Sequence, residues 1–90
     1  MYEVKFSPSV RHDLAKLALR ISESDFQNIE IAVLQLKEMP RPPGVRKIRG
    51  RENSYRVRVG KYRIVYEIQD KIQTVTIIEV IRRTDTTYNF

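Results

Sequence analysis

The sequence contains no cysteine, only one histidine and only three glycines. Without cysteine no disulfide can form, so we expect a protein of a reducing, cytoplasmic environment. One histidine cannot build a zinc site by itself, and the three glycines form no phosphate-binding loop. We therefore expect neither a metal ion nor any other cofactor.

Long hydrophobic runs are also missing. No stretch of about 18 consecutive apolar residues occurs, so the sequence predicts no membrane-spanning helix and no membrane partner. Glu3 and Lys5 interrupt the segment where a secretory signal would have its apolar region. The chain has 90 residues, of which 41% are hydrophobic and 31% charged. These values fit one globular domain over residues 1–90 with a thin core.

The net charge of +6 is concentrated in one block of the sequence. Residues 41–63 hold nine lysines and arginines and a single acidic residue, Glu52, whereas residues 1–40 and 64–90 each carry one more acidic than basic side chain. Most of the nine are arginines, whose planar guanidinium groups bind pairs of oxygen atoms. The block predicts an anionic partner, and a solvated basic face without a partner is the alternative.

Two helices are predicted in the first half of the chain. Residues 2–6 alternate as a short strand, and Ser7-Pro8 is a typical helix start for a helix over residues 8–20. A second helix begins near Ser24, because Gln27 follows at the spacing of a capping box. It ends near Met39, before the helix-breaking segment PRPPG.

Strands are predicted in the second half, over residues 45–49, 54–59, 62–69 and 72–81. The last of these has Asp70-Lys71 as its expected turn and reads as an interior strand. The order is therefore β-α-α-β-β-β-β. We predict an α+β fold in which a two-helix hairpin packs on one face of a mostly antiparallel sheet.

The segment SYRVRVGKYRIVY predicts a hairpin with a two-residue type II′ turn at Gly60-Lys61. Arg58 then lies opposite Arg63. One face carries apolar and aromatic side chains: Tyr55, Val57, Val59, Tyr62, Ile64 and Tyr66. The other face carries Arg56, Arg58, Arg63, Val65 and Glu67. A shift by one residue would bury the arginines, so the register is well specified.

Three arginines on one open sheet face predict a site for an anion, because like charges opposite each other destabilise a sheet. The alternative is a solvated face on which arginine stems cover apolar surface. Arg82 and Arg83 follow the last predicted strand, and Tyr88 comes six residues after Arg82. Guanidinium groups bind phosphate and a tyrosine ring stacks on an unpaired base, so this end favours an RNA surface. Alternatively, Tyr88 folds back onto the protein.

Three motifs, KIRG (47–50), YRVRVGKYRIVY (55–66) and VIRRTDTTY (80–88), resemble the RelE/ParE superfamily of type II toxin–antitoxin toxins, and its RelE-like branch in particular. The resemblance covers nearly the whole chain. It implies an mRNA interferase: an endoribonuclease that cuts messenger RNA in the ribosomal A site and thereby inhibits translation. The chemistry implied is metal-independent attack of a ribose 2′-OH on the adjacent phosphate. The partners implied are the ribosome with its mRNA and a cognate antitoxin, bound as a hetero-oligomer.

The same resemblance implies roles for individual residues. Arg56 and Arg58 match the paired basic residues of the third strand, and Arg63 matches a phosphate-stabilising arginine. Arg82 matches the general acid for the leaving 5′-oxygen, and Tyr88 matches the tyrosine that stacks on the base. The remaining basic residues of these segments are predicted to contact RNA: Lys47, Arg49, Arg51, Lys61 and Arg83.

The sequence departs from the family pattern in its candidates for a general base. Some relatives have lysines where this chain has Arg56 and Arg58, and others have a histidine where it has Ile81. Arginine stays protonated, so it stabilises charge but is a poor base. The only histidine, His12, is expected at the surface of the first helix. Two alternatives remain: a ParE-like inhibitor of DNA gyrase, and an inactive relative that only binds its antitoxin.

Overall fold

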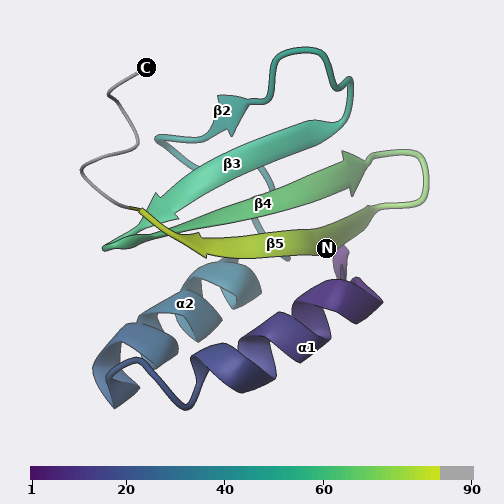
Figure 1. Ribbon diagram of the computed structural model, residues 1–90. Coiled ribbons are helices and arrows are strands. Elements are labelled where there is room, and N and C mark those ends of the chain that lie inside the picture. Colours follow the sequence, from purple (N-terminus) through teal and green to yellow (C-terminus); the bar gives the residue numbers. More distant parts are fainter. Residues whose placement is uncertain (84–90) are drawn as a thin grey trace.

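Seven helices and strands make up the described part of the protein, residues 1–83 of a computed structural model. In chain order they are β1 (Glu3–Phe6), α1 (Pro8–Leu17), α2 (Glu23–Gln35), β2 (Arg46–Lys47), β3 (Ser54–Val59), β4 (Tyr62–Gln69) and β5 (Thr74–Arg82). Both helices lie on one side of a single sheet (Figure 1). The predicted α+β fold and its element order are confirmed. Across residues 1–83, no helix combines the length and the apolar character that a membrane crossing requires.

The five strands of the sheet are arranged in the order β1-β5-β4-β3-β2. Three of the four pairings are antiparallel, and β1 pairs with β5 in parallel. The first and last strands within residues 1–83 are therefore neighbours, and β5 is an interior strand, as its apolar sequence indicates. The short β2 forms the edge beside β3.

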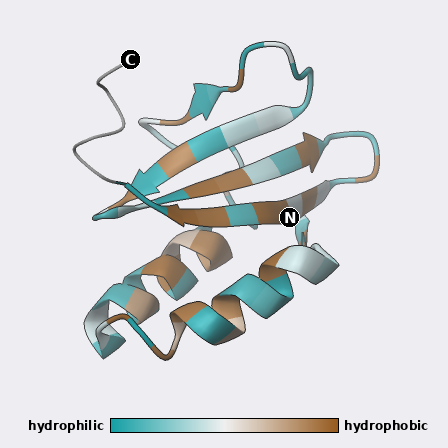
Figure 2. Ribbon diagram, in the orientation of Figure 1, coloured by the Kyte–Doolittle hydropathy of each residue, from teal (hydrophilic) through white to brown (hydrophobic). Residues whose placement is uncertain are grey.

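The β3–β4 hairpin has the predicted register, with Arg58 opposite Arg63 and Arg56 opposite Val65. Gly60 has a φ of 57° whereas Lys61 is not among the positive-φ residues, which is the type II′ pattern. Hydrophilic and hydrophobic residues alternate along β3 (Figure 2). The hairpin thus directs its apolar side chains to one side of the sheet and its arginines to the other.

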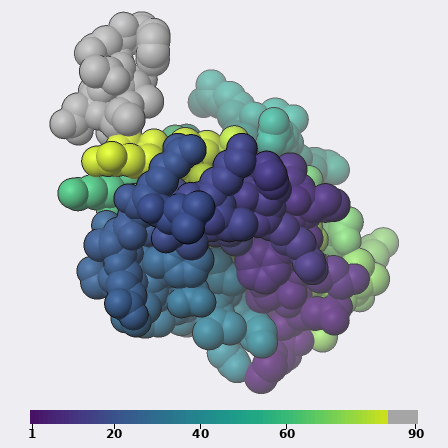
Figure 3. Space-filling view, turned by 60° about the horizontal axis from the view of Figure 1, so that its bottom comes forward, coloured from purple at the N-terminus to yellow at the C-terminus, as the bar shows by residue number. Residues whose placement is uncertain are grey.

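The hydrophobic core lies between the sheet and the helices. Its buried members are Val10, Ile29, Val33, Leu36, Tyr62, Ile64, Tyr66, Ile68, Val75 and Ile77. Seen from the helix side, α1 and α2 (purple to blue) cover much of the sheet (Figure 3). Val10 is fully buried in α1, and Ile29 and Val33 are buried in α2. The helices therefore cover one face and leave the arginine face open.

Both helices are shorter than predicted. Helix α1 ends at Leu17 rather than at residue 20, because the amides of Leu19 and Arg20 bond to carbonyls three residues back, which tightens the last turn. Helix α2 ends at Gln35 rather than near Met39 for the same reason: the amides of Leu36, Lys37 and Glu38 also bond three residues back.

The N-cap of α2 is Ser22, not Ser24. The backbone of Ser22 is extended, and its side-chain hydroxyl accepts a hydrogen bond from the Asp25 amide at 3.1 Å. Both serines belong to the same SES segment, so the sequence places a cap here without deciding between them.

Two strands also differ from the prediction. Strand β2 comprises only Arg46–Lys47 instead of residues 45–49, and β5 begins at Thr74 instead of residue 72. The turn before β5 is longer than Asp70-Lys71, because Gln73 adopts a φ of 49° and its amide bonds to the Asp70 carbonyl at 3.1 Å. Ile72 lies in this turn and is 64% exposed.

The PRPPG segment is anchored to the sheet by aromatic and charged side chains. The Tyr66 hydroxyl donates to the Pro40 carbonyl at 2.7 Å. Arg41 donates to both carboxylate oxygens of Asp70, at 2.9 and 3.3 Å, and its guanidinium lies 5.1 Å from the centre of the Tyr55 ring. The Tyr2 hydroxyl also donates to Asp70. This anchored segment leads through Gly44, with a φ of 88°, into β2.

The bond between Tyr66 and Pro40 gives a first prediction. We expect Tyr66→Phe to lower the free energy of unfolding by about 1 kcal/mol, because it leaves the Pro40 carbonyl without this donor. Tyr62→Phe is the matched control: Tyr62 is also buried, at 5% exposed against 0% for Tyr66, but it does not bond to the Pro40 carbonyl. Urea unfolding of both variants measures the difference. Equal losses in the two variants would contradict the prediction.

The Asp70 carboxylate gives a second prediction. Hydrogen bonds from Arg41, and then from Tyr2, hold the pKa of Asp70 below its ordinary value of 3.8. The stabilisation is therefore present above that value and is lost as the pH falls through the lower folded-state pKa. We expect Asp70→Asn to be less stable than the natural protein at pH 7 and the gap to close below about pH 4. Urea unfolding at pH 7 and pH 3 tests this, and a gap that does not change with pH would refute it.

Candidate anion-binding site

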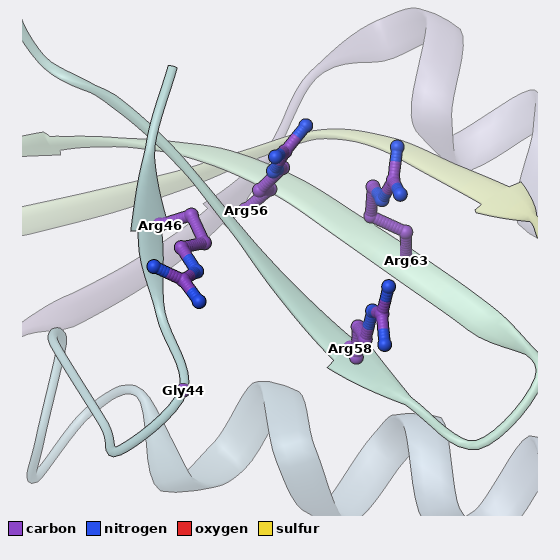
Figure 4. A pocket seen from close by; sticks show the side chains of 5 residues that line it. All are labelled: Gly44, Arg46, Arg56, Arg58 and Arg63. Atoms are coloured by element: carbon purple, nitrogen blue, oxygen red, sulfur yellow. The ribbon is translucent and has the colours of Figure 1, made fainter. Parts of the chain in front are cut away.

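Four arginines gather around one pocket on the sheet face that points away from the helices. The pocket has a volume of about 320 Å³ and is lined by Gly44, Arg46, Arg56, Arg58 and Arg63 (Figure 4). The side chains come from three adjacent strands, β2, β3 and β4. Three of the arginines, all but Arg46, are those that the hairpin pattern predicts to share a face.

The register of the sheet arranges these arginines in two cross-strand pairs. Arg46 lies opposite Arg56 across β2 and β3, and Arg58 lies opposite Arg63 across β3 and β4. Arg56 and Arg58 are two residues apart on β3, so they point to the same side of the sheet. The two pairs are consequently about 7 Å apart along the strand direction, since a strand rises roughly 3.3 Å per residue.

No carboxylate neutralises the pocket within residues 1–83. The ion pairs of that part of the chain join Lys5 to Glu3 and Arg41 to Asp70. Glu67 and Glu79 share the arginine face but form no ion pair with its arginines. Arg41, although it belongs to the same basic block, is used by the anchored PRPPG segment. The positive charge of the pocket is therefore available to a ligand.

The arginines also cover apolar surface, as the alternative interpretation proposes. Val65 is on the same sheet face yet only 7% exposed, and its cross-strand neighbours are Arg56 and Glu79. Long side chains bury their aliphatic stems while their charged ends stay in water. The burial of Val65 beside Arg56 is what this alternative predicts, so the two interpretations of the face are compatible.

Arg82 does not line this pocket. It lies opposite Tyr62, whose side chain is buried on the helix side of the sheet. The cause is an irregularity in β5, where Val65 pairs with Glu79 and the next residue, Tyr66, pairs with Ile77. Such a bulge reverses the alternation of the side chains that follow it. The role of Arg82 as a general acid therefore stays a prediction, and Tyr88 lies outside the described residues.

The bulge brings Arg83 to the side of the sheet that strict alternation assigns to Arg82. The Arg83 amide donates to the Lys61 carbonyl at 2.7 Å, and its Nη1 donates to the Gly60 carbonyl at 3.1 Å. Arg83 thus holds the β3–β4 turn next to Arg58 and Arg63. Its predicted contact with RNA stays a prediction.

The other predicted RNA contacts lie around the β2–β3 loop and the hairpin turn. Arg49 and Arg51, together with Lys47, line a second, shallow pocket of about 450 Å³. In the strand register Lys47 lies opposite Tyr55, so it is not on the arginine face. Lys61 is exposed in the hairpin turn. None of these four residues lines the first pocket.

Arg46 is the functional candidate that the sequence patterns miss. Arg46 belongs to the predicted strand 45–49 and precedes Lys47, which is a predicted RNA contact. The face of the sheet to which the Arg46 side chain points depends on how β2 pairs with β3. Six loop residues separate these strands, so no tight turn fixes the register in advance. The concentration of charge over residues 41–63 is the one signal in the sequence that includes Arg46.

The arrangement favours charge stabilisation over proton transfer. Every charged residue that lines the pocket is an arginine, which stays protonated at physiological pH. His12 is exposed on α1, in the other layer of the fold. Residues 1–83 contain no cluster of three or more side chains of the types that bind metal ions. The pocket can therefore bind oxyanions and stabilise negative charge that develops on a phosphate.

Comparison with known proteins decides the family. A model of the ParE toxin family, from the type II toxin–antitoxin system parDE, matches residues 4–86. Toxin RelG of Mycobacterium tuberculosis is 34% identical over 84 residues, which cover 93% of each chain. The chain belongs to the RelE/ParE family of type II toxin–antitoxin toxins.

Solved structures of RelE toxins have the same fold as this RelE/ParE toxin. The RelBE2 toxin–antitoxin complex from Mycobacterium tuberculosis contains a chain that is 28% identical, with a TM-score of 0.73, coverage of 91% of this toxin and 98% of that chain. The isolated RelE toxin of E. coli is 19% identical, with a TM-score of 0.78, and the match covers 99% of this toxin and 92% of that chain. The RelE toxin in the RelE–RelB complex from Pyrococcus horikoshii is 24% identical, with a TM-score of 0.77, and the match covers 93% of this toxin and 97% of that chain.

The repulsion within the pocket gives a third prediction. We expect Arg58→Gln to raise the free energy of unfolding of the free toxin by about 0.2–1 kcal/mol at low salt, because it removes a like charge directly opposite Arg63. The gain should shrink at high salt, where exposed charges are screened. Arg11→Gln, on the exposed side of α1, is the control with the same change in net charge. A loss of stability in Arg58→Gln at both salt concentrations would contradict the prediction.

Proposed function

We propose that this toxin is a ribosome-dependent mRNA endonuclease. It cuts messenger RNA in the ribosomal A site through metal-independent attack of a ribose 2′-OH on the adjacent phosphate, and so inhibits translation. The observation that carries the proposal is the pocket of four arginines, which no carboxylate neutralises within residues 1–83. Attack on a phosphodiester places additional negative charge on its oxygens, and fixed guanidinium groups stabilise that charge.

In this proposal Arg58 and Arg63 hold the phosphate that is cut. They face each other on two strands of a rigid hairpin, so both can donate to the oxygens of one phosphate. Arg56 adds a third positive charge beside them. The family resemblance alone supports two further roles: Tyr88 stacks on a base, and Arg82 protonates the leaving 5′-oxygen. The β5 register directs Arg82 away from the pocket, so this second role requires its side chain to reach the phosphate around the end of the sheet.

The proposed reaction relies on orientation and charge, because the pocket offers no base. A ribosome that holds the codon in place would supply the alignment of the 2′-OH with the phosphate. The 2′-oxygen would bond to phosphorus as the bond to the 5′-oxygen breaks, which leaves a 2′,3′-cyclic phosphate and a 5′-OH, and the 2′-OH proton would pass to water or to a ribosomal group. The arginines would lower the energy of the charged transition state without accepting that proton. This division of work is consistent with a toxin that acts on RNA only in the ribosome.

We also propose that a cognate antitoxin binds this toxin in a hetero-oligomer. RelE relatives from Mycobacterium tuberculosis and Pyrococcus horikoshii were crystallised as complexes with their antitoxins. An acidic segment of such a partner would complement the arginine face, and the affinity would fall with rising salt.

A ParE-like inhibitor of DNA gyrase is the second candidate, because the matching family model carries the ParE name. The relative that is 34% identical is Toxin RelG, and the chain that is 28% identical comes from a RelBE2 complex, so neither carries the ParE name, and this favours the nuclease. Accumulation of cleaved DNA–gyrase complexes on expression, with intact mRNA, would decide for the gyrase inhibitor. If expression causes neither DNA cleavage nor mRNA cleavage, the remaining candidate is a protein that only binds its antitoxin.

Primer extension on a defined message in a purified translation system tests the nuclease. We expect cuts within A-site codons that require ribosomes, and we expect Arg63→Gln to reduce the cleavage rate by about 10²–10³-fold, the usual cost of removing one donor to a developing oxyanion. Arg82→Ala should abolish cleavage if Arg82 is the acid. Arg11→Gln, an equal loss of charge on α1, should cut like the natural toxin. Intact message with the natural toxin would refute the proposal.

A further inference from the structure

Four guanidinium groups are more than one phosphodiester can use. A phosphodiester has a single negative charge and two non-bridging oxygens, whereas each arginine presents five donors in a planar fork. The pair Arg58 and Arg63 already supplies enough donors for both oxygens. The second pair, Arg46 and Arg56, lines the same pocket, and neither arginine takes part in an ion pair within residues 1–83.

The spacing of the two arginine pairs on the sheet resembles the spacing of successive phosphates in one nucleic-acid strand. Each pair spans two neighbouring strands, and the pairs are offset by two residues along β3, about 7 Å, and by one strand spacing across the sheet, about 5 Å. Their midpoints are therefore about 8 Å apart, and the long arginine side chains can adjust this spacing to that of two successive phosphates in a nucleic-acid strand. In Figure 4 the pocket extends from Arg46 at β2 to Arg63 at β4, rather than closing around a single point.

Arg46 is held in place by the framework around it. The strand that carries it is short, but the Val45 amide donates to the Pro42 carbonyl at 3.1 Å and the Ile48 amide to the Ser54 carbonyl at 2.8 Å. Gly44, which lines the pocket next to Arg46, has no atom within 4 Å of the position where a Cβ would be. The wall beside Arg46 is therefore open enough for a sugar–phosphate backbone to approach.

We infer that the pocket binds two successive phosphates of one RNA strand, the scissile one between Arg58 and Arg63 and its neighbour between Arg46 and Arg56. The inference rests on the proposed function and extends it, because it assigns Arg46 to RNA binding and gives the toxin a preference for a strand over an isolated phosphate. Arg46 contacts the phosphate that is not cut, so it positions the strand.

Short RNA ligands that cannot be cleaved test the two subsites without a ribosome. The probes are a 2′-O-methyl dinucleotide with one phosphate and the corresponding trinucleotide with two, each titrated into the toxin and followed by NMR. We expect the trinucleotide to bind about 10-fold more tightly, as a charge-assisted contact to the second phosphate would give. Arg46→Gln should remove this gain and leave the dinucleotide affinity unchanged.

Two further variants separate a specific contact from net charge. Arg11→Gln, with the same loss of charge on α1, should keep the full gain, and Arg46→Lys, which keeps the charge but loses the planar fork, should keep only part of it. Urea unfolding checks that each variant is folded. Equal affinity of the natural toxin for both probes, or an equal loss for both probes in Arg46→Gln, would overturn the inference.

The outcome is independent of the nuclease test. A 10-fold gain that depends on Arg46, together with intact mRNA in the translation system, would support the two subsites and refute the cleavage. Cleavage by a toxin that shows no gain would refute the subsites and support the nuclease.

Discussion

The register of the β3–β4 hairpin is the constraint on which both the core and the pocket depend. In the observed register Tyr62, Ile64 and Tyr66 are buried beneath the helices, and the arginines of the same two strands share the open face. A shift by one residue would expose the first set and bury the second, and the energetic cost of burying unpaired charges far exceeds the repulsion between exposed ones. The hydrophobic core therefore holds the arginines together although they repel each other.

One buried tyrosine, Tyr66, connects this core to the segment that carries Gly44 and Arg46 to the pocket. Tyr66 packs in the core, and its hydroxyl bonds to Pro40 at the start of the segment that leads to Gly44 and β2. Burial raises the pKa of this tyrosine further above its ordinary value of 10, and the protonated hydroxyl is the donor of this bond. Arg41 fixes the next position of that segment on Asp70. One member of the basic block thus stabilises the fold so that another, Arg46, can line the pocket.

The features that the sequence predicts well are those that neighbouring residues decide. The hairpin is closed by a two-residue turn, so alternation alone gives its register and the common face of Arg56, Arg58 and Arg63. Helix ends were wrong by a few residues because tight three-residue hydrogen bonds, which leave no pattern in the sequence, replace the last helical turns. Longer-range pairing decides the sides of Arg46 and Arg82, so the sequence patterns do not give them: the β2–β3 pairing crosses a loop, and the bulge between β4 and β5 reverses the alternation that leads to Arg82.

A pocket made only of arginines has consequences for how such a toxin is controlled. A histidine or lysine in a site can lose its proton, so its charge depends on pH, but guanidinium groups remain charged throughout the physiological range. The binding strength of this pocket therefore cannot be switched by protonation of the residues that line it. Under the proposed function only occupancy can control it: an acidic partner and the phosphates of RNA compete for the same charges, and the one that fills more of the four guanidinium groups displaces the other.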